Sequence, residues 1–130
     1  MLTGQDLAGC TPHAVIMALP ESVLLTATID RLRRAGWRVF HASTGDDVRE
    51  LADDIGPEVV VLPADGSDES GWLTCAKLLE ATPELGVIVV GKAAADEPDF
   101  ARFIGATLVP GDATAEELVD HIEGAALQAL

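Results

Sequence analysis

The sequence predicts an α/β fold: a three-layer αβα sandwich around a doubly wound parallel sheet of five strands in the order 2-1-3-4-5. Short apolar runs of strand type alternate five times with segments of helical periodicity. Three of these runs are apolar almost throughout, as strands covered by helices on both faces must be. Right-handed crossovers leave few other arrangements for such an alternation.

The first strand and the first helix are expected at 14–19 and 21–35. The strand reads "AVIMAL", and Gly36 is placed to end the helix. Apolar residues recur at helical spacing along this helix, which gives it a stripe that can pack on the sheet. The stripe consists of Leu25, Ile29, Leu32 and Ala35.

The second strand and helix are expected at 38–42 and 46–55. Ser43 or Thr44 is the expected cap of this helix, and Gly56-Pro57 ends it. Its apolar stripe consists of Val48, Leu51 and Ile55.

The second half of the chain repeats the pattern three times. One helix ends before Pro83, the next has Pro98 in its first turn, and the last begins with Asp112 or Thr114. The last helix buries Leu118, Ile122 and Ala125. The expected strands are 58–62, 86–90 and 106–109, and the expected helices are about 72–82, 97–104 and 112–127.

This arrangement is the flavodoxin-like fold, whose ligand sites lie at the carboxyl ends of the strands, where the strand order reverses. The loops after Leu19, Leu62 and Val90 are therefore where chemistry is expected. Residues 1–12 lack periodicity and are interpreted as a flexible leader, and 13–130 as the domain.

Charge and composition exclude several function classes. The net charge of −14 would repel a phosphate backbone or an anionic membrane surface, so we expect neither nucleic acid nor a membrane as a direct partner. Cys10 and Cys75 lie far apart and have no zinc-ligand spacing, and Cys75 is expected to be a buried thiol. No signal peptide or membrane-spanning run is visible, which predicts a cytoplasmic protein.

Three stretches, "RAGWRVFHASTGDDVREL", "GPEVVVLP" and "ATLVPGDATAEELVDHI", together resemble the CheY-like receiver domain of two-component response regulators. The resemblance covers about residues 14 to 124. It includes Gly36 before the second strand, Pro57-Glu58 before the third, Gly71 at the start of the third helix and Gly105-Ala106 before the fifth strand.

The resemblance implies a phosphotransfer site made of an acidic pair that holds magnesium, an acceptor aspartate, a hydroxyl residue and a lysine. None of these groups stands at the matching positions, so the chain resembles an atypical pseudo-receiver that lacks the phosphoacceptor aspartate. The acidic pair falls on Leu19 and Pro20, the acceptor on Pro63, the hydroxyl on Gly91, and the lysine on Pro110 or Gly111.

Three functions follow from this interpretation. The first is a non-enzymatic signalling or scaffolding module that acts through protein contacts, without phosphorylation, metal or cofactor. The second is a small-molecule sensor that uses the apolar strand-end crevice for a neutral or hydrophobic ligand. The third is a receiver phosphorylated on a displaced acid such as Asp65. Glu21 is interpreted as a favourable partner of a helix dipole.

The expected partner is another signalling protein or an output domain, and a homodimer is a further alternative. In the family, the fourth helix, fifth strand and fifth helix form the usual docking face. Trp72 is expected in the core, whereas Trp37 is the better candidate for an interface. The candidate contact residues are Phe100, Arg102, Phe103, Glu116, Glu117 and Asp120.

Overall fold

The computed structural model describes residues 13–65, 70–91 and 106–128. No helix within these ranges is long and apolar enough to cross a bilayer. The leader at 1–12 and the helix expected at 97–104 lie outside the described residues. The elements are β1 (Ala14–Met17), α1 (Val23–Arg34), β2 (Arg38–His41), α2 (Gly45–Ile55), β3 (Val59–Pro63), α3 (Gly71–Ala81), β4 (Gly86–Val90), β5 (Thr107–Val109) and α5 (Ala115–Gln128).

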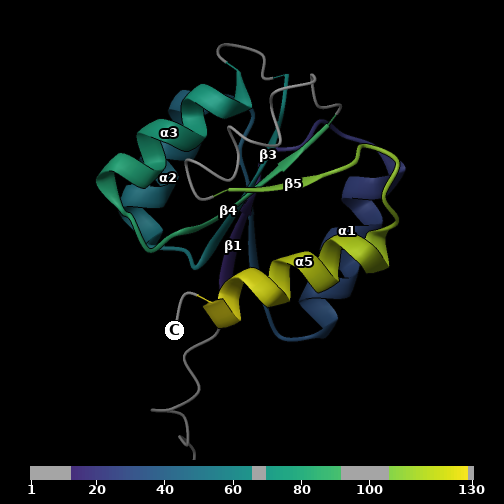
Figure 1. The fold of residues 1–130 in the computed structure, drawn as a ribbon. Helices are drawn as coiled ribbons and strands as arrows, with labels where there is room; N and C mark the ends of the chain where they lie inside the picture. The colour runs from purple at the N-terminus through teal and green to yellow at the C-terminus, as the bar shows by residue number, and fades with distance from the viewer. Residues whose placement is uncertain (1–12, 66–69, 92–105, 129–130) are drawn as a thin grey trace, which may run out of the picture.

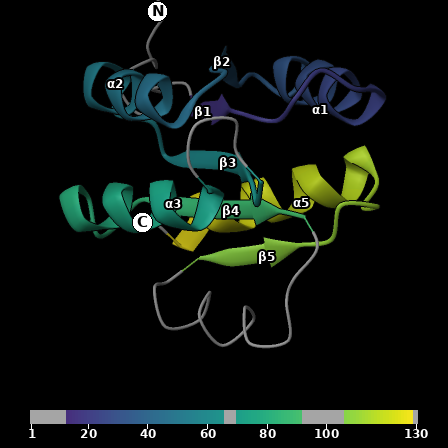
Figure 2. The same ribbon diagram turned by 90° about the horizontal axis from the view of Figure 1, so that it is seen from above.

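The five strands form one parallel sheet in the order β2-β1-β3-β4-β5, which confirms the predicted fold class. Helices α2 and α3 cover one face of the sheet, and α1 and α5 cover the other (Figures 1 and 2). The central strands β1, β3 and β4 are buried almost throughout, whereas β2 at the edge has exposed ends. The prediction that these apolar runs are strands covered on both faces is therefore confirmed.

The core consists of two clusters, one on each face of the sheet, because successive strand residues point to opposite faces. Val59 and Val61 belong to the cluster under α1 and α5, together with Leu118 and Ile122. The other cluster lies under α2 and α3. It includes Ile16, Val60, Leu62, Val48, Trp72, Cys75 and Leu78.

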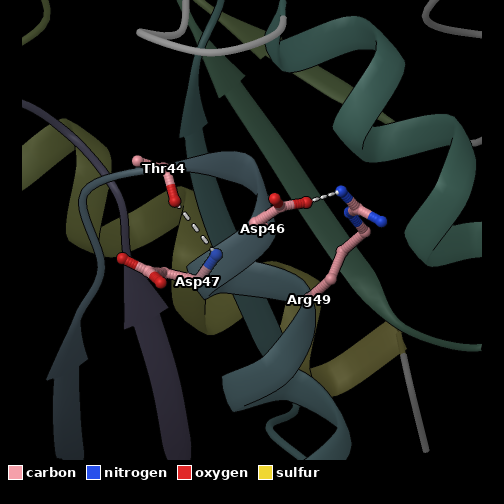
Figure 3. Close-up of polar contacts among 4 residues, drawn as sticks. All are labelled: Thr44, Asp46, Asp47 and Arg49. Carbon is pink, nitrogen blue, oxygen red and sulfur yellow. Dashed lines mark hydrogen bonds and ion pairs between the residues drawn. The ribbon is translucent and has the colours of Figure 1, made fainter.

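Side-chain caps determine where the helices begin. The Thr44 hydroxyl accepts a hydrogen bond from the Asp47 N–H (3.1 Å), and an Asp46–Arg49 ion pair crosses the same turn (Figure 3). Of the two expected caps for α2, Thr44 is therefore the one used. At α5, Thr114 forms a reciprocal capping box with Glu117, with hydrogen bonds of 2.9 and 3.1 Å.

Two sequence predictions about burial are wrong. Ala35 is exposed, because α1 ends at Arg34 and Ala35 is its C-cap, so the apolar stripe stops at Leu32. Trp37 is only 6% exposed and is no interface residue. Its backbone N–H donates to the Leu32 carbonyl (2.9 Å), and its indole lies in the same core cluster as Leu32. The centroid of the His13 ring lies 4.9 Å from that of the indole.

Burial raises the pKa of the Cys75 thiol from its ordinary value of 9.0 to about 12. The thiol is protonated in the folded protein but ionises near pH 9 in the unfolded chain. Its contribution to stability is therefore fully present below pH 9 and is lost as the pH rises toward 12. We expect the free energy of unfolding to fall over this window by at most about 1.4 kcal/mol per pH unit from this group.

Urea unfolding of the wild type and of Cys75→Ala at several pH values checks this prediction. The chain has no tyrosine, so few other groups titrate in this window, and those that do are common to both proteins. The difference in free energy of unfolding between the wild type and Cys75→Ala should narrow above pH 9. A difference that stays constant to pH 11 would contradict the assignment.

Candidate functional site

A hollow of about 370 Å³ lies at the carboxyl ends of the strands, where the sequence predicted the site. It brings together the five positions that the resemblance matched to the phosphotransfer groups. We call it the strand-end hollow. Its lining residues are Leu19, Pro20, Ser22, Leu24, Pro63, Ala64, Asp65, Val90, Gly91 and Gly111.

Main-chain hydrogen bonds connect the strand ends that border the strand-end hollow. The Ala64 N–H donates to the Val90 carbonyl (2.9 Å), and the Gly91 N–H donates to the Val109 carbonyl (3.0 Å). These bonds continue the ladders between β3, β4 and β5 past the last paired residues. Main-chain bonds thus tie the ends of three neighbouring strands to one another.

The start of α3 lies directly against the end of β3. The Gly71 N–H donates to the Ala64 carbonyl (2.9 Å), and Ser70 caps the helix through the Leu73 N–H. A Cβ at Gly71 would overlap the Pro63 carbonyl oxygen and lie 2.9 Å from its carbonyl carbon. Glycine is therefore required here for the close approach of the helix to the hollow.

Gly91 occupies the position matched to the family's hydroxyl residue, and its backbone is specific for glycine. Its φ is +156°, and a Cβ there would lie 2.7 Å from the Ala64 Cβ. A threonine or serine at this position would therefore strain the backbone and clash with the end of β3.

A second hollow of about 460 Å³ adjoins the first and shares Leu19, Pro20, Pro63 and Asp65 with it. We call it the rim hollow. Its polar residues include Glu21 and Asp65, which are both exposed, and His41, whose Nε2 lies 3.1 Å from the Leu19 carbonyl oxygen.

The sequence pattern did not connect His41 with the site. The missed signal is its position at the carboxyl end of β2, next to β1 in the sheet. Leu24 and Ser22 were missed as well, because they belong to the helix that follows β1 and not to a strand end. Among the described residues, no group of three or more His, Cys, Asp or Glu side chains could hold a metal ion.

The predicted contact face is described only in part. Glu116, Glu117 and Asp120 are exposed on α5, but Glu117 also serves in the capping box of that helix. Phe100, Arg102 and Phe103 lie outside the described residues.

These features define a doubly wound α/β domain with a mostly apolar hollow at the carboxyl edge of its sheet. No family model and no curated protein matches the chain. Solved structures do match. One is a CheY-like response regulator receiver domain protein from Methanospirillum hungatei JF-1, with a TM-score of 0.83 and 16% identity over 92% of this chain and 97% of that chain.

Two further receiver structures are similar over most of their length. The receiver domain protein from Clostridium thermocellum has a TM-score of 0.78 and 22% identity, and the match covers 89% of this chain and 95% of that one. The BeF3-activated DrrB receiver domain has a TM-score of 0.73 and 26% identity over 88% and 97%. The chain therefore has the fold of the CheY-like receiver domains of response regulators, as the sequence resemblance implied.

Proposed function

We propose that this chain is a receiver-like signalling or scaffolding module that acts through protein contacts and does not depend on an aspartyl phosphate. The observation that carries the proposal is Pro63, which ends β3 at the position matched to the acceptor aspartate. Proline has no nucleophilic side chain, and an acyl phosphate needs a carboxylate to form.

The donor set of the strand-end hollow does not fit the magnesium ion that phosphotransfer in receivers implies. Magnesium requires near-octahedral oxygen ligands. Of the lining side chains that the structure describes, only those of Ser22 and Asp65 carry an oxygen, and the Ser22 hydroxyl already accepts the Leu25 N–H (3.1 Å) as the cap of α1. Glu21 in the rim hollow adds one exposed carboxylate. The described residues of the two hollows thus supply two carboxylates, whereas the resemblance implies three: an acidic pair and an acceptor aspartate.

The proposed partner is another signalling protein or an output domain. Receiver structures that match this chain include a DNA-binding response regulator from Staphylococcus aureus and a receiver domain of the response regulator TorR. Exposed acids on α5 are the described part of the proposed contact face. Contact through this face, including contact with a second copy of the chain, requires no chemistry at the hollow.

Incubation with acetyl phosphate and Mg²⁺, followed by the mass of the intact protein, tests the proposal. We expect the mass to stay unchanged, because no acceptor carboxylate replaces Pro63. A receiver with a complete site, treated in parallel, controls for the donor. A stoichiometric gain of one phosphoryl group that Asp65→Asn abolishes would overturn the proposal in favour of the displaced acid.

A further inference from the structure

The two adjoining hollows combine an apolar floor with negative charge at the open side. The floor is formed by Leu19, Leu24, Pro63, Ala64 and Val90, which belong to or follow β1, β3 and β4 or lie in α1. Such a surface suits an apolar body of modest size, since pockets for small molecules are mostly apolar with a few polar groups that fix orientation.

The charged groups at the opening are carboxylates. Asp65 lines both hollows and Glu21 lines the rim hollow, and no arginine or lysine among the described residues lines either of them. The amino end of α1 reaches the hollow at Ser22 and adds roughly half a positive charge. Two carboxylates outweigh this contribution, so the described part of the opening carries a net negative charge.

We propose that the joined hollows bind a small organic cation, an amine whose apolar body lies on the floor and whose ammonium group lies between Glu21 and Asp65. This ligand class differs from the neutral ligand expected from the sequence, because the structure adds two acids to an apolar crevice. An ammonium group gains from these acids, whereas a carboxylate or phosphate is repelled by them.

His41 forms part of the wall of the rim hollow. Its Nε2 contacts the Leu19 carbonyl oxygen, which holds the ring along the wall of the rim hollow. Ser43 adds a hydroxyl on the same wall. The ammonium of a bound amine has three donors and can share them between the carboxylates and a hydroxyl oxygen.

Three probes with related skeletons test the inference: phenethylamine, phenethyl alcohol and phenylacetate, each titrated into the ¹⁵N-labelled full chain. We expect the amine to shift the backbone amide signals of Ala64, Asp65 and Gly91. It should bind about fivefold more tightly than the alcohol, the gain from one solvent-screened ion pair. Phenylacetate should bind more weakly than either. Added salt should reduce the preference for the amine.

Asp65→Asn should reduce the preference for the amine over the alcohol, and Glu21→Gln/Asp65→Asn should abolish it. Glu80→Gln, which neutralises an exposed acid on α3 outside both hollows, is the matched control and should leave the preference unchanged. Equal binding of amine and alcohol, or no shifts at these three amides, would overturn the inference. It rests on the proposal that the hollow carries no phosphoryl group, and the intact-mass measurement tests that proposal separately.

Discussion

Gly71→Ala is expected to lower the free energy of unfolding by about 3 kcal/mol, the upper part of the range for overpacking. The added Cβ would overlap the carbonyl oxygen of Pro63 and contact the Ala64 Cα at 3.3 Å. Both neighbours are backbone atoms, so no side chain can rotate away. The overlap is relieved only if α3 moves away from the end of β3, which also breaks the Gly71–Ala64 hydrogen bond. Urea unfolding followed by circular dichroism measures the change.

Gly124→Ala is the matched control for this substitution. Gly124 lies within α5, and a Cβ there would have no neighbour within 4 Å. The change should stabilise the protein by up to about 1 kcal/mol, because alanine is the better helix former. If both variants shift stability in the same direction, the clash at Gly71 is not the cause.

Gly91→Thr, which restores the family's hydroxyl, is expected to destabilise the protein by roughly 2–6 kcal/mol. Backbone strain at a φ of +156° contributes about 1–3 kcal/mol, and overlap with the Ala64 Cβ contributes a similar amount. The hydroxyl of a functional receiver therefore cannot be returned to this site by one substitution. Thermal and urea unfolding of the variant measure the loss.

The double variant Ala64→Gly/Gly91→Thr separates the two causes. Removal of the Ala64 methyl eliminates the overlap but leaves the dihedral angle, so about half of the loss should be recovered relative to Ala64→Gly alone. Full recovery would show that the backbone is not strained, and no recovery would show that the methyl contact is irrelevant.

The fold was predictable because its signals are local and repeated. Buried valine-rich runs, helical stripes and glycines at helix ends all agree, and Gly56 does take the left-handed conformation at the C-cap of α2. Burial at element ends was not predictable from periodicity. Ala35 continues the stripe of α1 in the sequence but follows the last helical residue. The burial of Trp37 depends on the turn after α1, in which its backbone N–H bonds back to the Leu32 carbonyl.

The strand-end hollow was predictable in outline, because parallel strands bring their carboxyl ends to one edge. Leu19, Pro63 and Gly91 could therefore be placed together from element order alone. The φ of Gly91 and the contact of His41 with a main-chain carbonyl could not be predicted, because both depend on how neighbouring loops pack. Carboxylates at Glu21 and Asp65 were visible in the sequence, but their common hollow was not.

The amide-to-carbonyl bonds from Ala64 to Val90 and from Gly91 to Val109 have an evolutionary consequence. They tie the ends of three strands together through peptide groups that every residue type except proline can supply as donors. Apart from Gly91, whose backbone requires glycine, residues at this edge can accordingly change their side chains while these hydrogen bonds persist. A domain of this fold could thus lose one set of reactive side chains during evolution and gain a different binding role while its sheet stays unchanged.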